Sequence, residues 1–324
     1  MISRAGHDRT ARLRPSGRSA ALLGAVAIAA ASAVAARAQE WRPEAFDYDR
    51  PADLDLRELP EPQARRLQDS RQREFIFRNT DGQDVPLLIT LPKKGRAPFP
   101  VVMLVHGYGS DRSAVTRMVG REFIDAGFAL AAPDMPMHGA RQGPPREMFP
   151  PDDPERLYRN VVRAVIDIRQ TIDVLERRRE LDTSPGVPIA GYSMGAWFAP
   201  LAGAADRRVP ALLLMGGGSL AVDARPDEDR PGAPVIENLL ERYTALQPGA
   251  ALARFAPRPV LMQNGRRDRL VPADGVRALF EAAGHPKELR WYDCGHILPP
   301  EAFREAASWL TVRIAPAATR PAAR

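Results

Sequence analysis

A serine in a glycine-flanked turn is the residue of this sequence best suited to nucleophilic chemistry. Ser193 lies between Gly191 and Gly195, after the apolar run 187–190 and before the alanine-rich run 196–205. This order predicts a buried strand, a sharp turn and a helix, with the serine at the turn. Glycines suit such a turn because neighbouring backbones approach too closely for a Cβ atom. The hydroxyl would then project from the edge of a sheet.

A serine hydroxyl is a poor nucleophile until a base removes its proton, and two later residues could act together as that base and the acid that orients it. Asp268 follows a predicted strand at 258–263, and His296 follows the last predicted strand at 288–292. We expect His296 to take the proton from Ser193 and return it to the leaving group, while Asp268 fixes the imidazole tautomer.

The rest of the chain predicts the sheet that would position these residues. Two alternating runs form a hairpin, and six further apolar runs are separated by helical segments. The predicted strands are 74–78, 85–91, 99–105, 128–132, 187–190, 211–215, 258–263 and 288–292. The predicted helices include 114–126, 154–181, 196–205 and 301–312. We therefore expect an α/β fold with a mostly parallel sheet of about eight strands and helices on both faces.

The chain order Ser193, Asp268, His296 on such a sheet resembles the α/β-hydrolase superfamily, over about residues 74–314. The loop His106-Gly107-Tyr108 is similar to the oxyanion loop of that superfamily. The loop 133–141 is similar to those of dienelactone-hydrolase-like and prolyl-oligopeptidase-like members. Members of the oligopeptidase branch carry a large propeller domain, and the segment before the hairpin is far too short for one.

The resemblance implies roles for further residues. The backbone N–H groups of Met194 and Tyr108 would bind the oxyanion, the first at a helix N-terminus and the second in the loop. Four residues could line a pocket: His106, Gly107, His138 and Trp197. His106 would order the oxyanion loop through its own hydrogen bonds. His138 is either structural or pocket-lining, and Trp197 is either core or acyl-pocket lining.

The loop 133–141 also holds two charged residues of opposite sign. Asp134 and Arg141 are expected to pair and hold this loop in place, without a catalytic role.

The first 38 residues have the pattern of a secretory signal peptide. An arginine-rich lead is followed by an apolar, alanine-dominated run that ends at Ala36-Arg37-Ala38. The run is shorter and less apolar than a spanning helix requires, which disfavours a stable membrane anchor. We expect cleavage after Ala38 and export to the periplasm or the exterior.

The remaining chain divides into a Pro- and charge-rich extension (39–72), a hydrolase domain (73–316) and a disordered tail (317–324). We expect the extension to lie over the domain. Within the domain, an insertion at 216–253 shows no strand pattern and is predicted to be helical around 235–246. It follows a strand at the edge where sites form in α/β sheets, so it is either a lid or pocket wall, or an inert surface excursion.

Charge and composition narrow the functional classes. The first 38 residues hold six Arg and one Asp, a net +5 of the whole-chain +6, so the remainder is close to neutral. No basic stripe with interleaved aromatics indicates nucleic-acid binding. No metal-ligand motif occurs, no cofactor is expected, and Cys294 is alone, so it cannot form an internal disulfide. Nothing in the sequence indicates the oligomeric state.

The sequence therefore predicts an exported serine hydrolase that acts on esters of small molecules or polymer-attached acyl groups through an acyl-enzyme. The alternatives are a serine peptidase or amidase of the prolyl-oligopeptidase-like type and a non-catalytic, hydrolase-like binding protein.

Overall fold

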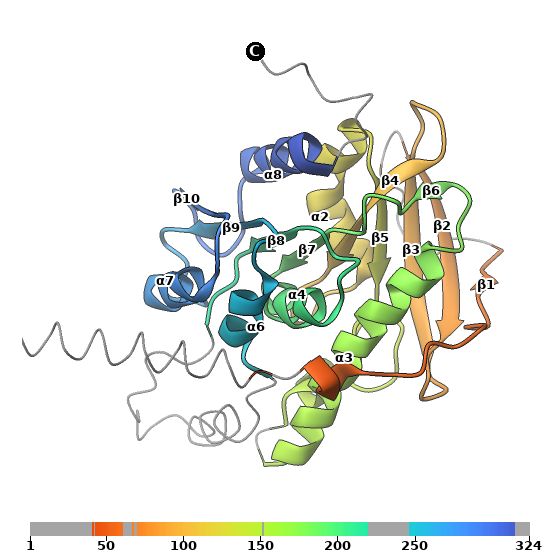
Figure 1. Cartoon of the computed structure of the whole chain (residues 1–324), viewed down its shortest axis with the longest axis horizontal. Coiled ribbons are helices and arrows are strands. Elements are labelled where there is room, and N and C mark those ends of the chain that lie inside the picture. The colour runs from red at the N-terminus through yellow and green to blue at the C-terminus, as the bar shows by residue number, and fades with distance from the viewer. Residues whose placement is uncertain are drawn as a thin grey trace, which may run out of the picture.

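A ten-stranded sheet runs through the computed structural model of the chain, which describes residues 41, 43–60, 67, 70–150, 152–219 and 246–314. The strand order is β1-β2-β3-β5-β4-β7-β8-β9-β10, with the short β6 paired to β4 (Figure 1). The pairings from β5 to β10 are parallel, whereas β1, β2 and β3 form an antiparallel edge. The predicted fold class, with a hairpin at one edge of a parallel sheet, is confirmed.

The strands are β1 (Arg57–Glu58), β2 (Ser70–Arg78), β3 (Asp84–Pro92), β4 (Phe99–Val105), β5 (Ala129–Pro133), β6 (Leu181–Asp182), β7 (Ile189–Tyr192), β8 (Leu212–Met215), β9 (Val260–Gly265) and β10 (Lys287–Tyr292). The α-helices are α2 (Arg112–Asp125), α3 (Pro154–Leu175), α4 (Met194–Ala205), α6 (Pro248–Phe255), α7 (Ala273–Ala282) and α8 (Pro300–Ile314). Two short 3-10 helices are η1 (Pro43–Phe46) and η2 (Pro145–Met148).

Two differences from the predicted elements have simple physical reasons. The sheet has two strands more than expected, β1 and β6, each of only two residues and thus too short to show a periodic pattern. The long helix α3 ends at Leu175 rather than at residue 181. The run 176–180 is wholly charged, so continuing the helix would bury no apolar side chain.

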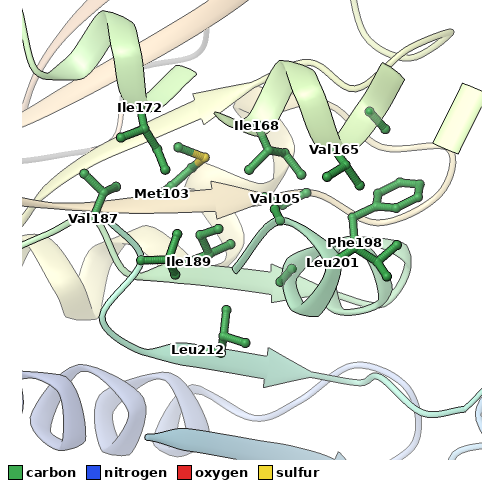
Figure 2. Packing of buried hydrophobic residues seen from close by; sticks show 14 of the residues in the cluster. Met103, Val105, Val165, Ile168, Ile172, Val187, Ile189, Phe198, Leu201 and Leu212 are labelled. Atoms are coloured by element: carbon green, nitrogen blue, oxygen red, sulfur yellow. The ribbon is translucent and has the colours of Figure 1, made fainter. Parts of the chain in front are cut away.

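Each face of the sheet has its own hydrophobic layer. Side chains alternate along β4, so Met103 and Val105 face one layer while Val102 and Leu104 face the other. Helices α3, α4, α6 and α7 cover the first face, and α2 and α8 cover the second (Figure 1). Figure 2 shows the first layer, where side chains of α3 and α4 interdigitate with those of β4, β7 and β8. This packing holds α4, and with it the turn that begins α4, rigidly against the sheet.

The N-terminal extension belongs to this core instead of only lying over it. Trp41, Phe46 and Leu54 are buried in the first layer. The hydroxyl of Tyr48 donates a 2.7 Å hydrogen bond to Asp173 on α3. Burial raises the pKa of Tyr48, so this hydroxyl keeps its proton. The extension also continues into the sheet, because β2 begins at Ser70, before the expected domain boundary at 73.

Several expected segments lie outside the described residues. These are the signal peptide (1–38), the tail (317–324) and residues 220–245, which hold most of the insertion and of its predicted helix. The described parts of the insertion, 216–219 and 246–253, contain no strand, and α6 begins inside the second of them. None of the helices in the described part of the chain has the length and apolar character needed to cross a membrane.

Candidate active site

Ser193 occupies the turn between β7 and α4 in a conformation that few residues adopt. Its φ of 53° and ψ of −113° are strained for a residue with a Cβ, at a cost of about 1–3 kcal/mol. Two close approaches explain the flanking glycines. A Cβ on Gly191 would lie 2.2 Å from the carbonyl oxygen of Gly195, and one on Gly195 would lie 2.1 Å from that of Val105. The turn that exposes the serine therefore requires both glycines.

Asp268 and His296 form a hydrogen-bonded pair at the carboxyl ends of β9 and β10. The distance from His296 Nδ1 to Asp268 Oδ2 is 2.7 Å. The other oxygen, Oδ1, accepts the backbone N–H groups of Leu270, at 2.8 Å, and of Val271, at 3.1 Å. The Asp268 side chain is only 1% exposed. Because Nδ1 is bound to the carboxylate, Nε2 is the imidazole nitrogen left to accept a proton from another group.

The His296 loop is tied to the strand that ends at Ser193 through Tyr192. The Tyr192 hydroxyl donates to the carbonyl of His296 at 2.7 Å and accepts from the N–H of Leu298 at 3.1 Å. Its ring also meets the imidazole edge-on, with centroids 5.9 Å apart. Burial raises the pKa of Tyr192 to about 12, so the hydroxyl stays protonated as a donor.

No hydrogen bond joins Ser193 to His296, although other contacts link the turn of Ser193 to the loop of His296. A Cβ on Gly216, directly after β8, would lie 3.4 Å from His296 Cε1, which is van der Waals contact, so the imidazole packs against this glycine. The φ of 60° at Gly216 is the reason that glycine suits this position. The Ser193 hydroxyl forms no hydrogen bond with any described residue. Such contacts are often long in unliganded enzymes and tighten when substrate binds.

The loop after β4 lies directly against the turn. A Cβ on Gly107 would be 3.3 Å from Ser193 Cβ. His106 fixes this loop: its Nδ1 donates to the Gly107 carbonyl at 2.8 Å and its Nε2 accepts from the Met135 N–H at 3.0 Å. Burial lowers the pKa of His106 to about 4, which keeps the ring neutral and able to accept at Nε2. His106 is fully buried, so it supports the loop without lining an open pocket.

The two expected oxyanion donors belong to the segments that meet at Ser193. Met194 is the first residue of α4, where backbone N–H groups have no partner within the helix. Tyr108 follows Gly107 directly. Met194 thus adjoins the serine in the chain, and Tyr108 follows the glycine that packs against the serine.

An aromatic wall extends from this loop to α4. Tyr108 contacts His138 edge-on at a centroid distance of 5.5 Å and Phe149 at 6.2 Å. Phe149 in turn contacts Trp197 at 5.7 Å. His138 and Trp197 are both buried, and the nitrogens His138 Nε2 and Trp197 Nε1 have no hydrogen-bond partner among the described residues.

The expected ion pair between Asp134 and Arg141 is wrong, because the Arg141 guanidinium reaches only the backbone carbonyl of Asp134, at 3.4 Å. The Asp134 carboxylate accepts the backbone N–H of Arg112 at 2.8 Å and its guanidinium at 2.5 Å, while Arg141 pairs with Asp167 on α3. The turn packs tightly on this carboxylate, because a Cβ on Gly139 would lie 2.1 Å from it. Two buried ion pairs therefore hold the loop, one to α2 and one to α3.

Two residues of this region were not predicted from the sequence. Tyr192 lies two residues past the predicted strand 187–190 and has no predicted role, although an aromatic hydroxyl beside the turn serine was the available signal. Phe149 lies in a proline-rich loop and is partly buried, and its large aromatic side chain was the only signal for this packing. Among the described residues, no group of His, Cys, Asp and Glu could hold a metal ion.

A strained serine between strand and helix, and a histidine–aspartate pair at the same edge of a parallel sheet, define an α/β-hydrolase. The family comparison refines this class: the chain belongs to the dienelactone hydrolase family, whose model matches residues 86–297. A search of curated protein sequences finds no match.

Solved structures of similar fold include two esterases. Acetyl xylan esterase 1 from Thermoanaerobacterium sp. JW/SL YS485 is 18% identical, with a TM-score of 0.66 over 86% of this chain and 94% of that one. The glucuronoyl esterase from Solibacter usitatus is 16% identical, with a TM-score of 0.61 over 84% and 91%. TT1662 from Thermus thermophilus is 25% identical, with a TM-score of 0.60 over 76% and 99%. The chain is a hydrolase by family.

Proposed function

We propose that this hydrolase cleaves carboxylic esters through an acyl-enzyme on Ser193, with His296 as base and Asp268 as its orienting acid. The observation that carries the proposal is the 2.7 Å contact between His296 Nδ1 and Asp268, next to the strained turn of Ser193. That contact selects the tautomer in which Nε2 can accept the serine proton.

The reaction follows from these positions in two steps. His296 takes the proton of Ser193 as the oxygen attacks the ester carbonyl, then protonates the departing alcohol. Water, activated by the same imidazole, releases the acid. The N–H groups of Tyr108 and Met194 would bind the oxyanion, and loss of one such donor costs about 2.7–4 kcal/mol in known enzymes.

Esters are favoured over peptides by the family and by the fold neighbours. Two of the neighbours are described as an acetyl xylan esterase and a glucuronoyl esterase, which suggests small or polymer-attached ester substrates here. A peptidase or amidase, and a hydrolase-like protein without catalysis, are the alternatives that experiment must separate.

We expect p-nitrophenyl esters of increasing acyl length to be hydrolysed at least about a hundredfold faster, in kcat/KM, than an aminoacyl anilide. A fluorophosphonate should label Ser193 in the same preparation, located by mass spectrometry of the labelled peptide. Faster hydrolysis of the anilide would indicate an amidase. Folded protein that neither reacts with the fluorophosphonate nor turns over any ester would indicate a non-catalytic protein.

We also propose that the protein is exported and that residues 1–38 are removed, leaving Gln39 as the first mature residue. The support is the basic lead, the apolar run and the Ala36-Arg37-Ala38 pattern. Intact mass of protein recovered outside the cytoplasm should correspond to a start at Gln39. A mature form that retains the apolar run would contradict removal and indicate an anchored protein.

A further inference from the structure

The loop after β10 crosses the carboxyl ends of β9 and β8 and reaches β7, the strand that leads to Ser193. A Cβ on Gly265, at the end of β9, would lie 2.1 Å from the carbonyl oxygen of Gly295. Directly after β8, a Cβ on Gly216 would lie 3.4 Å from His296 Cε1. The chain that follows β10 therefore runs back over its two neighbouring strands and brings His296 towards β7.

One tyrosine hydroxyl holds this loop at β7. Tyr192 is the last residue of β7 and directly precedes Ser193. Its hydroxyl donates a 2.7 Å hydrogen bond to the His296 carbonyl and accepts a 3.1 Å hydrogen bond from the Leu298 N–H. A single oxygen atom thus fixes the backbone on both sides of Ile297.

The imidazole of His296 consequently has two different anchors. Asp268, in the loop after β9, binds Nδ1 at 2.7 Å and so sets the rotation of the ring and its tautomer. The Tyr192 hydroxyl instead joins the backbone of His296 to the strand that ends beside Ser193. The aspartate therefore determines how the ring is turned, and the tyrosine determines how far the ring stands from the serine.

The distance between the two reacting side chains depends on such backbone contacts in this structure. No hydrogen bond joins Ser193 to His296 among the described residues, so the side chains themselves do not fix that distance. Proton transfer requires a donor and an acceptor about 2.6–3.2 Å apart. A misplacement of about 1 Å at a catalytic group can cost about a hundredfold in rate. A contact that holds the His296 backbone against β7 therefore bears directly on the chemical step.

We propose that Tyr192 is a positioning residue for catalysis, whose hydroxyl holds His296 within reach of Ser193. This inference rests on the proposed ester hydrolysis at Ser193. Tyr192 acts through the backbone of His296 and transfers no proton itself. Because the hydroxyl affects the proton transfer and not the binding of substrate, its loss should lower kcat and leave KM nearly unchanged.

Tyr192→Phe tests the proposal because it removes the hydroxyl and keeps the buried ring. The ring contacts Phe303 at a centroid distance of 6.5 Å, and Leu298 is buried in the same hydrophobic layer, so the loop should shift without detaching. We expect kcat on a p-nitrophenyl ester to fall about tenfold to a hundredfold. The rate of fluorophosphonate labelling should fall by a similar factor, because His296 must also activate Ser193 in that reaction.

Tyr292→Phe is the matched control, since Tyr292 ends β10 and is buried like Tyr192. Its hydroxyl accepts a 2.7 Å hydrogen bond from Gln263 and donates one of 2.8 Å to Glu305. Burial raises the pKa of Tyr292 to about 12, the same value as for Tyr192. Both variants thus lose a phenol with two hydrogen bonds, and the thermal midpoint should fall comparably. Only Tyr192→Phe should lower kcat, because the Tyr292 hydroxyl bonds to β9 and α8 and not to the loop of His296.

A double variant separates positioning from a general loosening of the site. Asp268→Asn should leave His296 unable to accept the proton of Ser193. If Tyr192 acts only through that proton transfer, Tyr192→Phe should cause almost no further loss of kcat in the Asp268→Asn protein. If the hydroxyl only stabilises the fold, the same fold-change should appear in both backgrounds.

Three results would overturn the positioning role: wild-type kcat in folded Tyr192→Phe, an equal loss in both backgrounds, or an equal loss in Tyr292→Phe. The last of these would assign the effect to lost stability. Wild-type protein that hydrolyses no ester and is not labelled by a fluorophosphonate would overturn the proposed function. Normal wild-type turnover with an insensitive Tyr192→Phe variant would overturn the role of Tyr192 alone.

Discussion

Ser193→Ala is expected to lower ester turnover by several orders of magnitude and to leave the fold intact. Removal of a serine nucleophile eliminates the covalent step, and only oxyanion binding and substrate positioning remain. Alanine keeps the Cβ of serine, so the strained φ of 53° is no harder to adopt. The hydroxyl makes no hydrogen bond to a described residue, so its loss leaves no buried group without a partner.

Single-turnover and steady-state rates on a p-nitrophenyl ester would measure the loss, and circular dichroism and the thermal midpoint would report the fold. Ser308→Ala provides a matched control, because Ser308 lies on the exposed surface of α8 and bonds only to Arg304 in its own helix. That control should retain activity and fluorophosphonate labelling. Near-normal turnover by a folded Ser193→Ala protein would rule out the serine mechanism.

The turn and the sheet could be predicted from the sequence because their signals are local. Glycines on both sides of a serine, between an apolar run and an alanine-rich run, leave few conformations that avoid a clash. The apolar runs of β4, β7, β8 and β9 are buried on both faces, so their composition alone marks them as strands of a parallel sheet.

Other features depend on contacts that no local pattern encodes. The Asp134 carboxylate pairs with Arg112, although Arg141 is nearer in sequence, because the end of β5 meets the start of α2 in the folded protein. Trp41 and Phe46 are buried because α3 and α4 leave an apolar surface that the extension covers. Neither residue lies in a periodic segment, so the sequence predicted only an extension that lies over the domain.

The Tyr192 hydroxyl illustrates the same limit within the site. Its partners, the His296 carbonyl and the Leu298 N–H, are more than a hundred residues away in sequence. The predicted strand ended at residue 190, two residues before Tyr192, whereas β7 extends to Tyr192. The hydrogen bonds of its hydroxyl join β7 to the loop after β10, which is three strands away in the sheet. The sequence therefore predicted the candidate reacting groups but not Tyr192, which holds the loop of His296.

The second large effect on turnover is expected from replacing the aspartate that orients His296. Three aspartates lie in the right part of the chain, and the structure separates them. Asp293 is 77% exposed and pairs with Arg267 at 3.0 Å. Asp274 is 67% exposed, lies in the first turn of α7 and pairs with Arg277 at 2.7 Å. Only Asp268 is buried, with its carboxylate on His296 Nδ1.

Asp268→Asn should lower turnover roughly ten-thousand-fold near neutral pH, and the hydrogen bonds of the carboxylate explain why. Oδ1 accepts the N–H groups of Leu270 and Val271, and these donors require an oxygen at that position. The amide oxygen of asparagine would take that place, which turns its NH₂ group towards His296. Nδ1 must then accept, so the proton moves to Nε2, and the ring can no longer take the proton of Ser193.

The three Asp→Asn variants, measured side by side, test this assignment. Asp268→Asn should fold normally, since each of its hydrogen bonds has a replacement, and should show its loss in kcat. Asp274→Asn should cost mainly stability, about 0.3–1 kcal/mol, because a negative charge in the first turn favours the helix dipole. Asp293→Asn should change turnover little, because its carboxylate faces solvent and Arg267. A large turnover defect in Asp293→Asn with none in Asp268→Asn would refute the assignment of the acid, while Ser193 and His296 could keep their roles.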